Sequence, residues 1–302
     1  MKQNNRISCY IGLLCLISIV LACGDSTEKQ PLQPQVNLAI SPDISIETSR
    51  VYGNSLLHAT YRWKTGTTFL PPDGSLMAKV HFTDDKGNIL IQDDHSLLLQ
   101  GIKDWKPDQT YDYKRIVYIP LIPRITKLDI LIGVYQPDDD TRFFLEATPA
   151  VRDKYKVGEI TVYPPRNPED LPEAKIEFGE GWHNAEFNTA DKSKWRWMAG
   201  KAVCRLKNPH RNAELFLRGW IPTEDLGQPS NITILINGEP FRTYENYKGN
   251  FDILESISQS MFNDQDMIEL TIETDKTYVP AEIGKNDDQR RLGIMVRIMY
   301  FN

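Results

Sequence analysis

Short apolar runs with a period of two recur along most of this chain, and they restrict its fold more than any other feature. Alternation puts every second side chain on the same face of a strand, so each run can cover one side of a core. The runs cover residues 56–63, 77–82, 116–119, 128–135, 195–197, 202–206, 215–220, 231–236, 267–274 and 292–301. Turn-forming residues separate them, and Asn237-Gly238 is the strongest hairpin signal in the chain. The pattern predicts an all-β protein built from antiparallel sheets.

A proline-rich segment divides these runs into two groups. Residues 164–172 contain four prolines, which cannot donate backbone hydrogen bonds and which favour an extended linker. We therefore expect two tandem β-sandwiches, at residues 36–163 and 175–302, joined by a linker at residues 164–174. Only residues 252–262 have the pattern of a short surface helix.

The beginning of the chain has the organisation of an export leader. Two cations precede an apolar run over residues 10–21, which is too short for a comfortable membrane span of about 20 residues. Small Ala22 then precedes Cys23, as at a cleavage point. The sequence from Val20 to Cys23 resembles the lipobox of bacterial lipoproteins, with valine in place of the usual leucine.

The lipobox resemblance implies that residues 1–22 are a signal peptide removed before Cys23, and that Cys23 then carries lipid. Two or more acyl chains, such as palmitate, anchor a protein stably to a membrane, whereas one chain binds only marginally. Residues 23–35 are polar and without periodicity, as a flexible tether should be. We thus expect a lipid-anchored protein of the bacterial cell envelope, and Gly24 favours the outer membrane by similarity to the enterobacterial sorting rule. The alternative is an ordinary secretory signal or an uncleaved anchor.

Charge and cysteine content limit the partners and the chemistry. The formal net charge of −6 becomes −8 when the two cations of the leader are removed, and no run of basic residues stands out. A nucleic-acid partner is therefore not expected. Apart from Cys23, the one cysteine after the leader is Cys204, which lies in an alternating stretch and is expected to be a buried, inert thiol.

Each half of the chain also resembles a known module. In residues 51–162, the Tyr-Arg-Trp run at 61–63 and the Ile-Gly-Val-Tyr run at 132–135 resemble an Ig-like β-sandwich of bacterial membrane and glycosyltransferase-associated proteins. In residues 175–302, the Gly-Trp-His run at 181–183 and the Trp-Arg-Trp run at 195–197 resemble carbohydrate-binding and galactose-binding-like jelly rolls. These resemblances imply the architecture and a context among envelope glycans, without a settled activity.

The densest cluster of aromatic and charged residues lies in the second half. Flat rings stack on the C–H faces of sugars, while carboxylates and guanidinium groups bind hydroxyls. Two of the tryptophans share a strand face, with the arginine between them on the other. We interpret the cluster as a candidate glycan site formed by Trp182, His183, Glu186, Trp195, Arg196 and Trp197. The alternative is structural: both strand tryptophans belong to the core, and Glu186 pairs with Arg196.

Other polar groups in the sequence give weaker signals. The Asp-Asp-His run at residues 93–95 puts acid beside base, but no activated nucleophile accompanies it. The acidic residues 138–140 are interpreted as a solvated hairpin tip, because calcium requires six to eight oxygen ligands. For the same reason, Asp287 and Asp288 are interpreted as a solvated turn or as part of an Asp–Arg pair with Arg290 or Arg291. The histidines lack the spacing of a zinc site, and His58 and His81 are both expected to be packed and hydrogen-bonded within their strands. We expect no catalytic residue, no metal and no cofactor.

These observations favour a non-catalytic envelope lipoprotein that binds or helps to assemble cell-envelope or extracellular glycans. A rival interpretation is a structural or protein-interaction lipoprotein, in which the second half contacts an envelope protein rather than sugar. A third is a polysaccharide-modifying hydrolase, whose active site would be assembled from residues far apart in the sequence.

Overall fold

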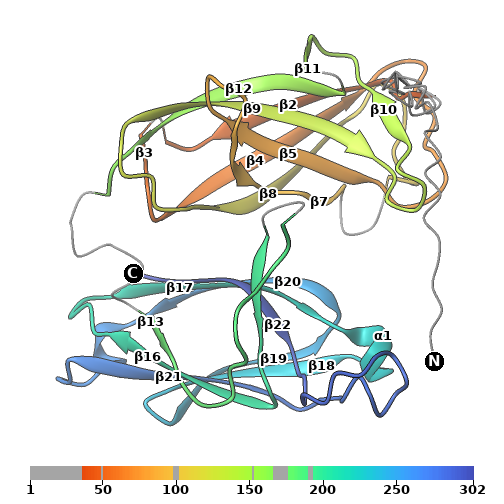
Figure 1. The fold of residues 1–302 in the computed structure, drawn as a ribbon. Coiled ribbons are helices and arrows are strands. Elements are labelled where there is room, and N and C mark those ends of the chain that lie inside the picture. Colours follow the sequence, from red (N-terminus) through yellow and green to blue (C-terminus); the bar gives the residue numbers. More distant parts are fainter. Residues whose placement is uncertain (1–35, 49, 98–101, 152, 166–175, 190–192) are drawn as a thin grey trace, which may run out of the picture.

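The computed structural model describes residues 36–302, except residues 49, 98–101, 152, 166–175 and 190–192. This part of the chain is almost entirely β-structure in mostly antiparallel sheets, which confirms the predicted fold class (Figure 1). Cys23, the predicted signal peptide and the tether lie outside the described residues, as does most of the predicted linker. None of the helices in the described part has the length and apolar content needed to cross a bilayer.

Two sheets form the first sandwich. The smaller sheet contains β2 (Ile40–Ile46), β4 (Ser55–Thr65) and β8 (Thr110–Ile119). The centre of the larger sheet contains β5 (Met77–Thr83), β9 (Thr126–Tyr135) and β12 (Lys154–Tyr163). Short strands extend the larger sheet, namely β1 (Val36–Asn37), β3 (Val51–Tyr52), β6 (Ile89–Gln92), β7 (His95–Ser96), β10 (Arg142–Phe144) and β11 (Pro149–Val151).

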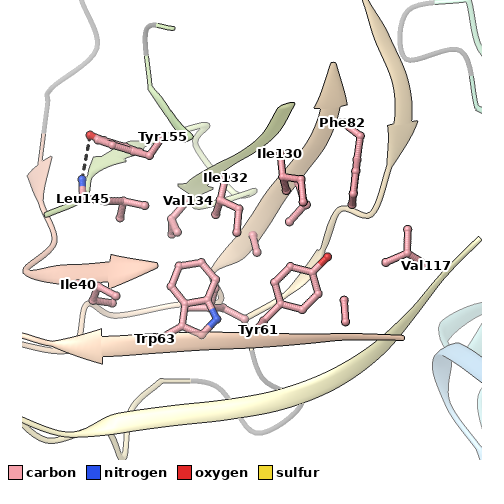
Figure 2. Packing of buried hydrophobic residues seen from close by; sticks show 14 of the residues in the cluster. Ile40, Tyr61, Trp63, Phe82, Val117, Ile130, Ile132, Val134, Leu145 and Tyr155 are labelled. Carbon is pink, nitrogen blue, oxygen red and sulfur yellow. Dashed lines mark hydrogen bonds between the residues drawn. The ribbon is translucent and has the colours of Figure 1, made fainter. Parts of the chain in front are cut away.

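Alternation along β4 fills the space between the two sheets. Odd-numbered positions from Leu57 to Thr65 are buried, whereas the even-numbered positions between them are exposed or half-buried. His58 is one of the exposed positions, so the prediction that it is packed is wrong, because it lies on the outer face of the strand. Tyr61 and Trp63 are fully buried and, in Figure 2, point toward the strand that carries Ile130 and Ile132. Full burial of one large apolar side chain contributes about 1.5 to 3 kcal/mol, so this half has a substantial core of its own.

The second sandwich contains two five-stranded sheets. One consists of β13 (Ile176–Phe178), β16 (Lys201–Lys207), β21 (Met267–Thr274), β18 (Ser230–Ile236) and β19 (Glu239–Tyr247). The other consists of β14 (Glu186–Phe187), β15 (Lys194–Trp197), β22 (Met295–Phe301), β17 (Ala213–Ile221) and β20 (Gly249–Ile257). Helix α1 (Thr223–Leu226) is a single turn. Cys204 is buried between the sheets as predicted, and burial raises the pKa of its thiol to about 12.

The Asn237-Gly238 turn has the backbone that its sequence predicts. Both residues have positive φ, 51° and 83°, which is the requirement of a type I′ turn. The turn joins β18 to β19 with Ile236 opposite Glu239, and its twist matches that of the two strands. The hairpin prediction is therefore confirmed.

The predicted surface helix at residues 252–262 is wrong. Residues up to Ile257 belong to β20, and only Gln259–Met261 form a 3₁₀ turn, η3. Phe251, Ile253 and Ile257 are buried, and their odd-numbered spacing has the period of a strand. The segment pairs with β17 at nine positions, and this pairing decides its structure in spite of its local resemblance to a helix.

The two sandwiches have separate buried clusters but are in contact. Among the described residues, no strand of one sandwich pairs with a strand of the other. Strand β8 lies on the side of the first sandwich that faces the second (Figure 1). There the ring of Tyr118 is 6.0 Å from that of Tyr300, and Arg218 donates a 2.7 Å hydrogen bond to the carbonyl of Ile116. The boundary at residues 164–174 stays a prediction.

Candidate functional site

A short hairpin brings two of the predicted site residues together. Strands β14 and β15 are antiparallel, with Glu186 directly opposite Trp195. The indole Nε1 of Trp195 donates a 3.1 Å hydrogen bond to Glu186 Oε2. Side chains directly opposite each other on paired strands lie about 5 Å apart at Cβ, so the register itself creates this contact.

Two residues of a distant loop complete the cluster around Glu186. Arg290 donates a 2.7 Å hydrogen bond to Glu186 Oε1 and a further 2.7 Å bond to Asp288 Oδ2. Hydrogen bonds from Arg290 lower the pKa of Asp288 to about 2. Glu186 therefore pairs with Arg290, not with Arg196 as the structural alternative supposed. We call Glu186, Trp195, Asp288 and Arg290 the Trp195 cluster.

Arg196 and His183 lie beside this cluster but have other partners. Arg196 Nη1 donates a 3.0 Å hydrogen bond to the carbonyl of His183, and its guanidinium lies 4.4 Å from the centre of the Phe178 ring. His183 Nε2 is 3.1 Å from the carbonyl oxygen of Arg291. Arg196 therefore holds the loop before β14 and stacks on a ring, as expected for the strand face opposite the tryptophans.

The three tryptophans occupy different environments. Trp197 is only 9% exposed and packs with Tyr278, Leu292 and Met295. Trp182 is half-buried against the second core, with its ring edge to face with Phe178. Trp195 is partly buried against the Trp197 group and is less buried than Trp197. Of the two strand tryptophans, Trp195 is thus the one able to stack on a ligand.

A second charged cluster lies at the contact between the sandwiches. Asp93, whose side chain is fully buried, accepts hydrogen bonds of 2.9 Å each from Tyr61 Oη, Arg115 Nη2 and Arg218 Nη1. Arg218 belongs to the second sandwich and also binds Asp252 through two 2.7 Å hydrogen bonds. Burial opposes the ionisation of Asp93, but the two arginines outweigh it and lower its pKa. We call this the Asp93 network.

The Asp-Asp-His run at residues 93–95, where the sequence puts acid beside base, has a structural role in the fold. His95 Nδ1 is 2.5 Å from the carbonyl oxygen of Asp93, and its Nε2 is 2.6 Å from Tyr113 Oη. Burial lowers the pKa of His95 to about 4. Because the Asp93 carboxylate is fully enclosed, this network holds the two sandwiches together rather than presenting a reactive group to solvent.

Sequence reasoning did not include several residues of these clusters. An Asp–Arg pair was one of two interpretations of residues 287–291, and Asp288 and Arg290 do form one, but the contact of Arg290 with Glu186 spans 104 positions of sequence. Arg218 had a usable signal, since it is the one charged residue between Phe216 and Ile221 of β17. A lone charge within an apolar strand usually has a buried partner. In the described part of the chain, no group of three or more His, Cys, Asp or Glu residues could hold a metal ion.

No family model and no curated protein matches this chain. Among solved structures, β-glucuronidase 2 of Bacteroides uniformis aligns at 15% identity and a TM-score of 0.24, covering 86% of this chain and 30% of its own length. The sporulation control protein Spo0M of Bacillus subtilis aligns at 10% identity and a TM-score of 0.26, covering 74% of this chain and 91% of its own. The chain thus spans under a third of the glucuronidase. These similarities assign neither a family nor an activity.

Proposed function

We propose that the second sandwich binds a glycan at the Trp195 cluster, in a non-catalytic lipoprotein anchored to the bacterial envelope through Cys23. In this proposal the first sandwich is an Ig-like module and the second a carbohydrate-binding jelly roll. The observation that carries it is Trp195, which is only partly buried and is held by Glu186 within a group of charged side chains. A fixed aromatic ring beside a few polar groups is the usual composition of a sugar site.

The hydrogen bonds of the Trp195 cluster keep its groups in place before a ligand arrives. Glu186 uses one oxygen for Trp195 and the other for Arg290, so the carboxylate cannot rotate freely. Each carboxylate oxygen has a second lone pair, which can accept a hydrogen bond from a sugar hydroxyl. Groups that are already ordered lose little conformational entropy on binding.

The charge state of the cluster supports binding rather than hydrolysis. A glycoside hydrolase requires a carboxylic acid that donates a proton to the leaving oxygen. Asp288 has a pKa of about 2 because Arg290 donates hydrogen bonds to it, so it is ionised at neutral pH. Arg290 also donates a hydrogen bond to Glu186, so the same guanidinium group holds both carboxylates of the cluster.

The Asp93 network favours a second candidate, a structural or protein-interaction lipoprotein. Asp93 of the first sandwich is enclosed by Arg218 of the second, and a buried ion pair requires one defined arrangement of its partners. A fixed orientation of two sandwiches suits a protein that presents both to one envelope partner. Under this alternative the Trp195 cluster stabilises the β14–β15 hairpin and binds no sugar.

Comparison of Trp195→Ala with Trp197→Ala tests the glycan proposal. Loss of the Trp195 ring should weaken binding on a glycan array by about 1 to 3 kcal/mol, the scale of a partly buried aromatic contact. Loss of buried Trp197 should instead cost about 3 to 5 kcal/mol of folding stability. Phe187→Ala is the matched control, because Phe187 is 58% exposed on the neighbouring position of β14. Unchanged glycan binding by Trp195→Ala would favour the protein-interaction alternative.

A further inference from the structure

On the outer face of the larger sheet of the first sandwich, an amine lies beside a buried imidazole. Lys154 Nζ is 2.6 Å from His81 Nδ1. His81 is only 2% exposed, and its Nε2 faces Asp94 Oδ1 at 3.6 Å and the Gln92 amide at 3.3 Å. The Gln92 amide nitrogen can only donate, so His81 Nε2 accepts and Nδ1 carries the ring proton, directed at Lys154. A nucleophile in contact with a proton-transfer group that a third group orients is the arrangement found in covalent catalysis and covalent binding.

Gly133 makes this contact geometrically accessible. Lys154 begins β12 and His81 lies in β5, while β9 runs between these strands. A Cβ at Gly133 of β9 would be 2.7 Å from the carbonyl oxygen of Asp153 and 3.6 Å from Cγ of Lys154. Because glycine has no Cβ, the Lys154 side chain can cross β9 closely and reach His81.

The surrounding charges increase the reactivity of the Lys154 amine. Burial, reinforced by nearby Lys79 and by Arg142, lowers the pKa of Lys154, while Asp153 and Asp94 oppose this shift. A lower pKa increases the fraction of neutral amine, which is the nucleophilic form. In the described part of the chain, no salt bridge involves Lys79 or Lys154, so neither ammonium is neutralised by a carboxylate.

A shallow depression lies over Gly133 and Asp153, which are neighbours of Lys154, although Lys154 itself does not line it. It is lined by Lys79, Tyr135, Asp140, Arg142 and Asp153, together with Gly133. Arg142 pairs with both of these aspartates, each at 3.2 Å. Lys79 lies 5.7 Å from the centre of the Tyr135 ring and remains available to an anionic group.

We propose that Lys154 captures small carbonyl compounds that carry an anionic group, forming a reversible imine, with Lys79 pairing with the anion. The Lys154 nitrogen bonds to the carbonyl carbon as the C=O π bond breaks. Both protons of the neutral amine leave with the carbonyl oxygen as water. For each of them, His81 Nδ1–H donates its proton to that oxygen and takes one back from the amine nitrogen, because Gln92 Nε2 donates to His81 Nε2 and leaves the ring proton on Nδ1. The product is a C=N bond, and no oxidant or reductant takes part.

Reductive trapping in the mature chain tests the proposal. The protein is incubated with glyoxylate and sodium cyanoborohydride near neutral pH, and the modified lysines are measured by peptide mass spectrometry. Lys156 is the matched control, because it lies on the same strand but donates a 2.7 Å hydrogen bond to Asp129, which raises its pKa. Lys154 should be modified faster than Lys156, by about tenfold for each unit by which its pKa is the lower of the two.

Two further experiments distinguish imine formation at this site from the general reactivity of an exposed lysine. Lys79→Gln should slow trapping of glyoxylate while leaving that of neutral glycolaldehyde unchanged. His81→Gln should reduce the preference for Lys154 over Lys156 in a variant that circular dichroism shows to be folded. If this variant does not fold, the dependence of the trapping rate on pH in the wild-type chain tests the proposal instead. Trapping at Lys154 should then reach half its maximum at a lower pH than trapping at Lys156. Equal rates at Lys154 and Lys156, or equal pH profiles, would overturn the proposal.

Discussion

At the residue scale, Asp93 shows how a charged side chain is kept inside this protein. Its side chain has no exposure, and removing one partner of a buried ion pair typically costs about 3 to 5 kcal/mol. Arg115 and Arg218 each place Nη atoms 2.9 Å from its Oδ1, and Tyr61 donates to its Oδ2. Full satisfaction of both oxygens is the condition under which such a network is tolerated.

The neutral His95 in this network predicts a stability that falls with acidification. Burial lowers the folded-state pKa of His95 to about 4 from an ordinary value of 6.5. As pH falls below 6.5 the unfolded chain binds this proton first, so the free energy of unfolding decreases until about pH 4. The loss should total about 3 kcal/mol. Urea denaturation between pH 7 and 4 measures it.

His95→Gln is the control for this pH dependence. Glutamine has no group that titrates in this range, so the variant should be less stable at pH 7 but should show a flatter profile between pH 6.5 and 4. A profile parallel to that of the wild type would show that other groups cause the pH dependence.

At the scale of elements, two hairpins define the local geometry of the second sandwich. The β18–β19 hairpin turns at Asn237-Gly238, and the β14–β15 hairpin sets Glu186 opposite Trp195. In both, the strand register decides which side chains meet, because a shift by one residue would move every side chain to the other face.

Gly238→Ala should destabilise the second sandwich by about 1 kcal/mol. Gly238 has a φ of 83°, a conformation that is strained for alanine, and a Cβ there would have nothing within 4 Å to compensate by packing. Thermal unfolding measures the change. Gly158→Ala in β12 is the control, because its Cβ would make ordinary contacts of 3.4 and 3.6 Å and φ is not positive. A loss equal in both variants would refute the turn explanation.

At the scale of the whole molecule, the two sandwiches have separate cores and a specific charged contact between them. The first buried cluster extends from Leu38 to Val162, and the second from Met198 to Phe301. The charged contact through Asp93 and Arg218 then links them across 125 positions of sequence. We therefore expect two units that fold separately and dock in one orientation.

Separate expression of residues 36–165 and 176–302 tests this organisation. Each half should show a cooperative thermal transition, since each buries its own core. The first half should be less stable than in the intact chain, because Asp93 loses Arg218. Asp93→Asn should reduce the difference in stability between the isolated first half and the same half in the intact chain. Two unfolded halves would show that the sandwiches depend on each other and that the predicted boundary is misplaced.

Cys23→Ser should release the protein from membranes or leave it as an unprocessed precursor. The reason is that the proposed lipid on Cys23 is the anchor, and a protein held by acyl chains loses its membrane affinity with them. Fractionation with metabolic fatty-acid labelling measures both effects. Retention of Cys23→Ser in membranes, together with no label on the wild type, would contradict the lipoprotein proposal.

The sequence alone determined the fold class and the local hairpins. Strand alternation has a period of two within single segments, so β4 and the Asn237-Gly238 turn could be predicted without knowing their partners. The proximity of Glu186 and Trp195 follows for the same reason, since nine positions separate them. Residues 252–262 were misassigned because Glu255 interrupts the alternation of Phe251, Ile253 and Ile257, and the pairing with β17 decides that this segment is a strand.

Only the tertiary structure decided which distant charges meet. Arg290 reaches Glu186 across 104 positions, Arg218 reaches Asp93 across 125, and Lys154 reaches His81 across 73. It also decided that Trp197 is in the core and Trp195 is only partly buried, although both lie on one face of β15. These outcomes depend on which strands become neighbours and how the two sandwiches dock. A residue's own type and its near neighbours cannot specify them, because burial and ion pairing are set by groups from the rest of the chain.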